Sequence, residues 1–213
     1  TEAFELQKKI VDARANRRIS DVFILLEHPP VFTANRDTTL KNILASDEEL
    51  KKQGVAVCKT DRGGDVTYHG PGQIVGYIIL DLKDHGKDLH LYIRRVEQLL
   101  IDTLSDFGID SGRDPQHPGV WVGRNKVAAI GIAVKSGWIT MHGFALNVKP
   151  NMAHYKMIVA CGIADKGVTS MKDLLQRDVA LSDVRHRLVA NYETLFGRET
   201  GKITKEEIVR CLL

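Results

Sequence analysis

Apolar residues recur at helical spacing in several segments of the chain. In the first, residues 2–17, Leu6, Ile10 and Ala13 stand about one turn apart among Lys and Arg. Two further helix starts carry a capping pair, a Ser or Thr followed three residues later by Glu, at Ser46 and at Thr204. We therefore expect a short helix after Ser46 and longer helices at 2–17, 89–107, 182–196 and 205–213.

The segments between these helices carry the strand pattern. A continuous apolar run at 22–26 and a largely apolar segment at 74–82 are typical of buried strands, and 55–58 is typical of a shorter one. Residues 120–122 and 127–134 flank a turn and predict a hairpin, which 138–148 extends to a three-stranded meander. This arrangement predicts an α+β fold, one mixed β-sheet flanked by helices, in a single domain spanning 1–213.

Composition and charge narrow the classes of function. A chain of 213 residues that is 43% hydrophobic and 27% charged is typical of a globular protein with a full core. Its net charge of +3 is too small and too scattered to indicate nucleic-acid binding. No apolar run approaches the roughly 18 residues of a membrane helix, and no signal-peptide pattern follows Thr1. We expect a cytoplasmic protein that does not contact membranes.

The three cysteines, Cys58, Cys161 and Cys211, are far apart and odd in number. A disulfide framework or a zinc site is therefore not expected, and we predict no metal. Reduced thiols fit the cytosol.

Cys161 is a candidate nucleophile because Gly162 follows it and leaves the backbone free to approach a substrate carbonyl. A nearby cation or backbone N–H groups would raise its thiolate fraction. The alternative is a buried structural cysteine, since Cys is among the most buried residue types. Cys58 ends an apolar run and Cys211 stands among apolar residues of the last helix, so both fit that alternative better.

Lys126 is the candidate partner of this thiol. The small residues Ala128, Ala129 and Gly131 that follow it give up packing volume inside a strand, which often marks close approach by a ligand or another backbone. A partly desolvated lysine at the edge of such a gap would stabilise a thiolate and later act as a base. The alternative is an ordinary solvated lysine where a hairpin re-enters the sheet.

A glycine-rich loop spans residues 62–73. Several backbone N–H groups can converge there on an anion or a polar chain, although neither a Walker A loop nor a dinucleotide fingerprint fits its sequence. The alternative is a tight turn that needs positive φ. His69 in this loop is either a general base or a hydrogen-bonding partner of the loop.

Residues 142–148 indicate the wall of a groove, because Gly143 and Ala145 stand on either side of Phe144. His142 is a candidate supporting residue. It is otherwise a satisfied core histidine or part of a bulge.

Taken together, these segments resemble the octanoyltransferases of lipoate biosynthesis, the lipoyl(octanoyl) transferase or LipB family. The motifs that carry the resemblance are Leu26-Glu27-His28-Pro29, Arg62-Gly63-Gly64 with Thr67-Tyr68-His69-Gly70-Pro71-Gly72-Gln73, Lys126 with Ile130-Gly131, His142-Gly143 with Ala145 and Asn147, Cys161-Gly162-Ile163, and Thr169-Ser170-Met171.

The resemblance implies that octanoyl moves from octanoyl-acyl carrier protein to a lysine of a lipoyl domain of 2-oxoacid dehydrogenases, or of glycine cleavage H protein, without a cofactor. It implies that Cys161 is the acyl-accepting nucleophile and that Lys126 lowers its pKa. It also implies the fold of lipoate- and biotin-protein ligases, and a further N-terminal strand before Thr1. We expect a monomer. The substrate-binding walls implied by position are Arg62, Gly63, Gly64, Asp65, Val66, Thr67, Tyr68, His69, Ala129, Ile130, Gly131, Gly143, Phe144 and Ala145.

The octanoyl chain needs an apolar tunnel, and we expect the small residues to leave that space. These residues are Ala128, Ala129, Gly131, Gly143 and Ala145.

Two other functions stay open at this point. An ATP-dependent lipoate or biotin ligase of the same fold would work through an acyl-adenylate and would need no cysteine. A non-catalytic module would only hold lipoylated domains.

Overall fold

The structure is a computed structural model that describes residues 2–35, 37–135, 137–162 and 166–212. Within these ranges the side chains of residues 37–39 and of Cys161 are not described. Ile163 and Leu213, which belong to a motif and a helix predicted above, lie outside the described residues, as does Thr1. None of the described helices is long and apolar enough to cross a lipid bilayer.

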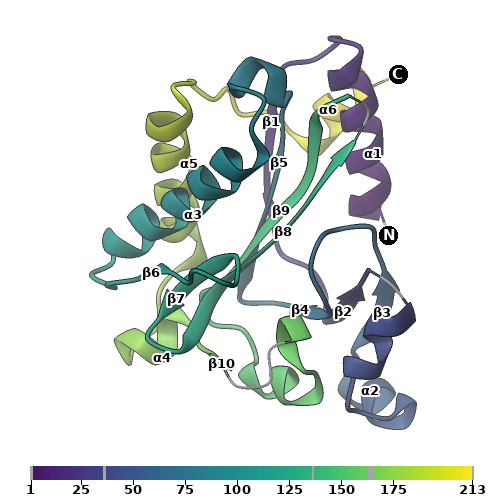
Figure 1. Cartoon of the computed structure of the whole chain (residues 1–213), viewed down its shortest axis with the longest axis vertical. Coiled ribbons are helices and arrows are strands. Elements are labelled where there is room, and N and C mark those ends of the chain that lie inside the picture. Colours follow the sequence, from purple (N-terminus) through teal and green to yellow (C-terminus); the bar gives the residue numbers. More distant parts are fainter. Residues whose placement is uncertain (1, 36, 136, 163–165, 213) are drawn as a thin grey trace.

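A large sheet forms the centre of the fold (Figure 1). Over the described residues it has seven strands in the order β1-β5-β9-β8-β7-β6, and β10 pairs with β8 outside this path. Neighbouring strands are antiparallel except for the parallel pair of β10 and β8, so the sheet is mixed. The strands are β1 (Val22–Leu26), β5 (Gln73–Ile79), β6 (Gly112–Arg113), β7 (Gly119–Val122), β8 (Asn125–Lys135), β9 (Ile139–Asn147) and β10 (Gly167–Val168).

Two long helices lie together on one side of this sheet (Figure 1). The first, α3 (Leu89–Ser105), is capped by the preceding residue Asp88, whose carboxylate accepts a hydrogen bond from a backbone N–H of the first turn. Its apolar stripe, which includes Leu99, packs with α5 (Leu181–Phe196) and with sheet residues such as Ile78 in the main core. The helical periodicity of the sequence thus builds the largest core cluster. The other α-helices are α1 (Glu2–Ala15), α2 (Asp47–Gln53), α4 (Met171–Leu175) and α6 (Lys205–Cys211), and the short 3₁₀ turns are η1 (Asp37–Asn42), η2 (Leu82–His85), η3 (Met152–Met157) and η4 (Ala160–Gly162).

A second, smaller sheet lies beside the large one together with α2 (Figure 1). Its order is β3-β2-β4, with β2 (Val31–Ala34) parallel to β3 (Ala56–Lys59) and antiparallel to β4 (Thr67–His69). The sequence pattern predicts β3 one residue early and does not predict β2 or β4. Strands of three or four residues carry too few positions for a period to be recognised.

The remaining predictions agree with the structure to within a few residues. The α+β class, the mixed sheet, the hairpin of β7 and β8 and its extension by β9 are confirmed. The capping box predicted at Thr204 is present in full, and the Ser46 hydroxyl accepts the predicted bond from Glu49 N at 3.2 Å. Two predictions are wrong in detail. Strand β1 is half-buried rather than buried, and β5 ends at Ile79 because the chain turns into η2.

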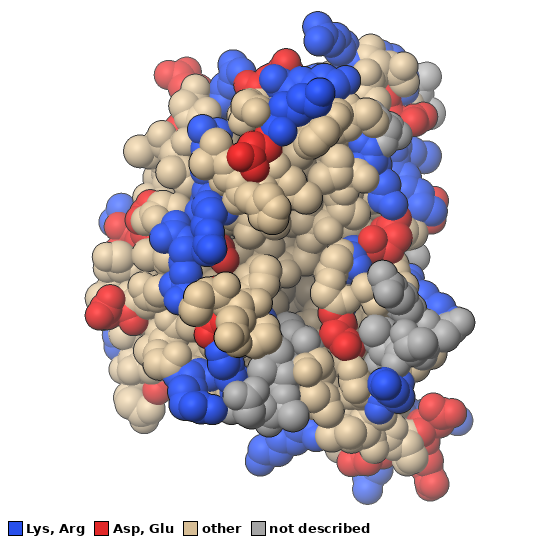
Figure 2. Space-filling view, in the orientation of Figure 1, with Lys and Arg blue, Asp and Glu red and all other residues tan. Residues whose placement is uncertain are grey.

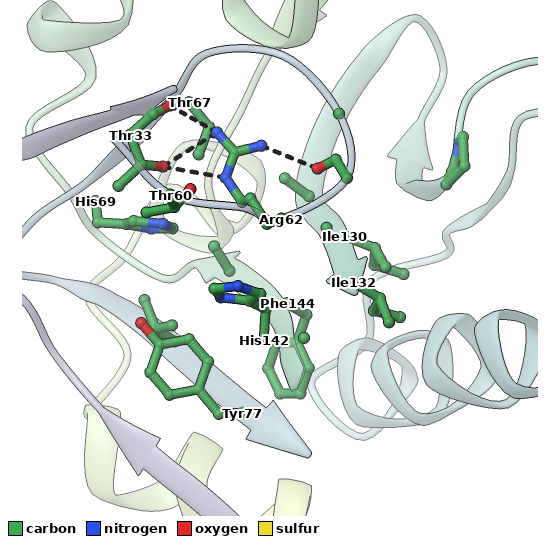
Figure 3. Close-up of a pocket in the computed structure, with 18 of the residues that line it drawn as sticks. Thr33, Thr60, Arg62, Thr67, His69, Tyr77, Ile130, Ile132, His142 and Phe144 are labelled. Carbon is green, nitrogen blue, oxygen red and sulfur yellow. Dashed lines mark hydrogen bonds between the residues drawn. The ribbon is translucent and has the colours of Figure 1, made fainter. Parts of the chain in front are cut away.

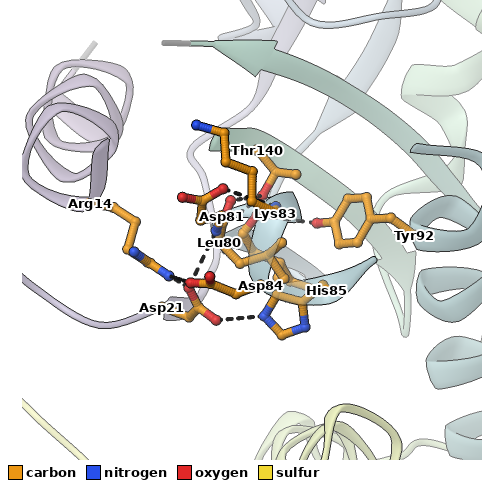
Figure 4. A network of polar contacts seen from close by, with 10 residues as sticks. Arg14, Asp21, Leu80, Asp81, Lys83, Asp84, His85, Tyr92 and Thr140 are labelled. Atoms are coloured by element: carbon orange, nitrogen blue, oxygen red, sulfur yellow. Dashed lines mark hydrogen bonds and ion pairs between the residues drawn. The ribbon is translucent and has the colours of Figure 1, made fainter. Parts of the chain in front are cut away.

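A buried ion-pair network joins α1 to η2 (Figure 4). The Asp21 carboxylate accepts hydrogen bonds from Arg14 Nε at 2.7 Å and from His85 Nε2 at 2.8 Å, and Arg14 also reaches Asp84 at 2.6 Å. Burial alone would raise the pKa of Asp21, but its hydrogen bonds to His85 and Arg14 and the charge of Arg14 lower it. The network fixes α1 against the edge of the large sheet.

Candidate active site

A cavity of about 370 Å³ lies between the large sheet and the small sheet. The face seen in Figure 2 is hollowed near its middle, where the surface is mostly uncharged. The cavity floor comes from β5, β8 and β9, and its walls come from β2, β4, the loop after β3, the start of α3 and the turn before β7. It collects most of the predicted site.

The glycine-rich loop lies directly on the backbone of β8. Gly63 N donates to Ile132 O at 3.1 Å, and a Cβ added to Gly131 would lie 2.8 Å from Gly63 O. Neither position has room for a side chain without moving the loop. Two segments that the sequence separates by almost seventy residues therefore form one wall.

Arg62 anchors this loop to the small sheet (Figure 3). Its buried guanidinium donates to Thr33 O at 2.6 Å, to Thr33 Oγ1 at 3.0 and 3.1 Å, and to Gly63 O at 3.1 Å. The planar fork of arginine suits such a set of acceptors. Arg62 thus sets where the loop meets the cavity.

Strand parity divides the predicted substrate-binding residues. Thr67 and His69 on β4 line the cavity, whereas Val66 and Tyr68 face the opposite side and pack in a separate core cluster. Ala128 likewise belongs to the main core and not to the cavity, contrary to the prediction that it leaves space for a chain. The predicted residues that do line the cavity are Arg62, Gly63, Gly64, Asp65, Thr67, His69, Lys126, Ala129, Ile130, Gly131, His142, Gly143, Phe144 and Ala145.

His69 is held as a neutral ring. Its Nδ1 lies 2.7 Å from Gln73 Oε1, and Gln73 Nε2 donates to Tyr68 O and Asn147 Oδ1. Because the amide nitrogen faces two acceptors, the amide oxygen faces His69, which assigns the ring hydrogen to Nδ1. Burial lowers the pKa of His69 to about 3. Of the two predicted roles, hydrogen bonding to the loop is the one this geometry supports.

His142 lines the cavity (Figure 3), and its ring is also hydrogen bonded. Its Nε2 lies 2.8 Å from Asp61 Oδ1, its ring stacks on Phe4, and its backbone has a φ of 66°. Burial lowers the pKa of His142, against the raising effect of Asp61. His142 therefore combines two of the predicted roles, because it lies in the wall of the cavity and its ring has a hydrogen-bond partner.

Lys126 is buried, with 7% of its surface exposed, at one end of the cavity. Its Nζ donates to Pro118 O at 3.2 Å and lies 4.7 Å from the centre of the Trp121 ring. Among the described side chains, no carboxylate forms an ion pair with it. The alternative of a solvated lysine is therefore wrong.

A β-bulge aims Lys126 at this end of the cavity. Val120 pairs with Ala128, but Trp121 pairs with Lys126, so Val127 is the extra residue. Bulges re-aim side chains and are frequent beside active sites. The bulge accounts for a charged side chain on a strand whose neighbours are apolar.

The backbone around Cys161 is anchored on both sides. Before Cys161, Val159 N donates to Asn42 O at 2.8 Å, and Asn42 Nδ2 donates to Asp65 Oδ2 at 2.8 Å. Directly after Cys161, a Cβ on Gly162 would lie 2.8 Å from the same Asp65 oxygen. Further along, the chain returns through β10, and Thr169 N donates to Lys126 O at 3.0 Å. The turn that contains Cys161 thus packs against the cavity-lining Asp65 and rejoins the strand of Lys126.

The other two cysteines are not core residues, contrary to the prediction. Cys58 is half-buried and lines the cavity, and Cys211 is exposed. Strand β3 lies at the edge of the small sheet, so its apolar run does not guarantee burial.

Some lining residues were missed by the sequence reasoning. They come from elements distant in the chain and stand in no recognisable pattern, although His28 belongs to one of the quoted motifs. These residues are Phe4, Gln7, His28, Val31, Thr33, Cys58, Thr60, Val75, Tyr77, Leu89, Ile93, His117, Pro118 and Ile132.

Comparison with known proteins identifies the family. The model of the lipoyl protein ligase A/B catalytic domain matches residues 1–193. The octanoyltransferase of Clostridium kluyveri is 44% identical over 98% of this chain and 88% of its own length. That of Caldicellulosiruptor bescii is 46% identical over 99% of this chain and 93% of its own length. This chain belongs to the octanoyltransferase family. The predicted resemblance and the class of acyltransferase are confirmed.

Solved structures agree on the fold. Lipoate-protein ligase A bound with ATP superposes with a TM-score of 0.73 at 15% identity, over 97% of this chain and 87% of that one. A lipoate protein ligase from Thermoplasma acidophilum with bound lipoic acid reaches 0.72 at 16% identity, over 97% and 88%. At such identities the likeness shows the fold alone, and it confirms the predicted lipoate-ligase fold.

Proposed function

We propose that this octanoyltransferase moves octanoyl from octanoyl-acyl carrier protein to a lysine of an apo lipoyl domain or of glycine cleavage H protein. Cys161 carries the octanoyl group as a thioester, and Lys126 is its proton partner. Residues 1–213 act as one catalytic domain, as a monomer in the cytoplasm, with no metal and no cofactor.

The observation that carries the proposal is that the backbone before and after Cys161 is tied to residues lining the same cavity. Before it, Val159 N donates to Asn42 O, and Asn42 Nδ2 donates to the cavity-lining Asp65. After it, Thr169 N donates to the backbone carbonyl of Lys126, which also lines the cavity. The buried ammonium of Lys126 has one carbonyl and one aromatic ring around it among the described groups, so it has hydrogen-bonding capacity left. A cation of this kind favours a neighbouring thiolate.

In the first half-reaction the Cys161 thiolate attacks the carbonyl carbon of the octanoyl thioester. Backbone N–H groups near Gly162 or in the glycine-rich loop stabilise the oxyanion. The carbon–sulfur bond to the carrier's phosphopantetheine breaks, and the leaving thiolate takes a proton from the Lys126 ammonium.

In the second half-reaction the lysine amine of the acceptor attacks the enzyme thioester. Neutral Lys126 takes the proton that the amine loses, an amide forms, and the Cys161 thiolate leaves. Conversion of a thioester to an amide is downhill, so no ATP is needed.

The acyl chain is proposed to lie along β8 and β9 in the cavity. The small side chains there are Ala129, Gly131, Gly143 and Ala145, and apolar contact comes from residues such as Ile93. Burial of the chain is worth about 0.8 kcal/mol for each CH₂ group.

Intact-protein mass spectrometry after mixing with octanoyl-acyl carrier protein tests the proposal. We expect one octanoyl adduct on the wild type, none on Cys161→Ala, and transfer of the adduct to an added apo lipoyl domain. Cys58→Ala is the matched control, because Cys58 is a second thiol in the same cavity, and it should keep the adduct. An adduct that survives in Cys161→Ala but is lost in Cys58→Ala would overturn the assignment.

An ATP-dependent ligase of the same fold is separated by a second assay. Full activity of Cys161→Ser with ATP and free octanoate, and none with octanoyl-carrier protein, would favour that ligase.

A further inference from the structure

A buried carboxylate on α3 is connected to Lys126 through one intervening peptide group. Glu97 is 1% exposed, and its Oε2 accepts hydrogen bonds from Arg94 at 2.8 Å and Arg113 at 3.1 Å. Its other oxygen, Oε1, accepts from Gly119 N at 3.2 Å. The two arginines hold the carboxylate in place through Oε2, and Oε1 is directed at the start of β7.

The N–H of Gly119 and the carbonyl of Pro118 belong to one peptide group. Among the described residues every peptide bond is trans, so these two groups point in opposite directions. The N–H end meets Glu97, and the carbonyl end accepts from Lys126 Nζ at 3.2 Å. A single peptide plane thus connects the carboxylate to the ammonium.

The charges at its two ends lock the orientation of this peptide. A flipped plane would direct its carbonyl at the Glu97 carboxylate and its N–H at the Lys126 ammonium, and both contacts would be repulsive. Bonds to charged groups are stronger than neutral ones, and a buried site screens them little.

Packing fits the same arrangement. Gly119 has a φ of 131°, and an added Cβ would lie 2.6 Å from Ala128 O and 3.4 Å from Lys126 Cε. The absence of a side chain lets the turn lie against the stem of Lys126, where strand β7 begins. The turn is itself tied down, since Asp114 accepts from the N–H groups of Gln116 and His117.

We propose that Glu97 is a positioning residue of the acyl transfer, which orients the Pro118–Gly119 peptide so that its carbonyl holds the Lys126 ammonium toward Cys161. The inference rests on the proposed function. It adds a residue from α3, far from the motifs of the site, to the machinery that sets the proton partner.

A double-mutant cycle tests this, with single-turnover formation of the octanoyl adduct as the readout. We expect Glu97→Ala to slow acylation about tenfold while the KM for octanoyl-carrier protein changes less than twofold. In the Lys126→Met background the same substitution should change the rate less than twofold, because its target is gone. Glu97→Gln, which keeps the shape, should show the same dependence on Lys126 and covers the case in which Glu97→Ala does not fold.

Leu99→Val is the matched control, since Leu99 is a fully buried core residue of the same helix. It should lower the melting temperature and leave acylation per folded molecule unchanged. The inference would be overturned if the Glu97 substitutions slowed acylation equally in the wild-type and Lys126→Met backgrounds. It would also be overturned if they slowed it in neither background.

Failure of the proposed function looks different, because the wild type itself would then form no adduct. In that case the same set of Glu97 and Lys126 variants can be compared by the rate at which iodoacetamide alkylates Cys161. A Glu97 effect that depends on Lys126 would support the positioning role, and one that does not would refute it.

Discussion

Substitution of Ala129 by Leu should shorten the acyl chain that the enzyme accepts. Ala129 lines the cavity and pairs across the sheet with Ala145, which lines it too. It stands three residues along β8 from Lys126, and because Val127 is the extra residue of the bulge, the two are separated by two strand steps, about 7 Å at roughly 3.3 Å per residue. An octanoyl chain extended from a thioester beside Lys126 would therefore reach Ala129 with its outer carbons.

The expected size of the effect follows from burial. Leu adds three carbons to the side chain of Ala, and these occupy the place of about three methylenes of the substrate. At about 0.8 kcal/mol for each buried CH₂ group, octanoyl loses about 2.4 kcal/mol, or roughly 60-fold in kcat/KM. A butanoyl chain ends before Ala129 and should lose less than about threefold.

The assay compares kcat/KM for octanoyl-carrier and butanoyl-carrier proteins with one acceptor domain. Ala133→Leu is the control, because Ala133 lies on the same strand and face but outside the cavity lining. It should leave the preference for chain length unchanged. An equal loss for both chain lengths in Ala129→Leu would mean that the fold was disturbed or that the chain lies elsewhere, and would refute the reasoning.

Three further substitutions test the charges of the structure. Lys126→Met should slow octanoyl-adduct formation on Cys161 by about 100-fold or more, as loss of a general acid does, and wild-type rates in mass spectrometry would contradict this. Burial lowers the pKa of His69 to about 3, against about 6.5 in an unfolded chain. Between these two values the unfolded state binds more protons than the folded state, so the free energy of unfolding falls as the pH falls. For His69 this decrease should amount to up to about 2 kcal/mol from pH 6.5 to pH 5. In urea titrations at several pH values, His69→Gln should reduce the change of unfolding free energy with pH. The same change with pH as in the wild type would contradict this prediction. Asp21→Asn leaves the buried Arg14 without a charged partner at that contact and should cost about 3 kcal/mol in urea unfolding, with acylation per folded molecule unchanged. A cost below about 1 kcal/mol would show that the network contributes little.

Local patterns in the sequence predicted the parts of the fold that rest on local physics. The helical stripe of α3 and the hairpin that starts β8 each contain enough positions for a period to be recognised. The small sheet was missed because β2 and β4 pair across more than thirty residues and are three or four residues long. Their pairing follows from tertiary contacts that a short window does not contain.

Missing β4 had a direct consequence for the site. Once Thr67 to His69 is known to be a strand, its alternation sends Thr67 and His69 to one side and Tyr68 to the other. Without the strand, all residues of the motif look equivalent. The error at Ala128 has a different origin, because its strand was predicted. The prediction placed Ala128 and Ala129 on the same wall, whereas neighbouring strand residues point to opposite faces: Ala128 packs in the main core and Ala129 lines the cavity.

The sequence predicted only part of the role of two glycines in the cavity wall. The sequence indicates a close approach at Gly131 and a loop or tight turn at Gly63, but it does not show that these two glycines meet. In the structure the carbonyl of Gly63 fills the space that a side chain on Gly131 would take, and a side chain on Gly63 would meet Ile132 O. Substituting either glycine pushes the loop away from β8 and with it Arg62, which is tied to Thr33. The wall of the cavity is therefore a contact between two backbones, and such a contact is set by the pair and not by either residue alone.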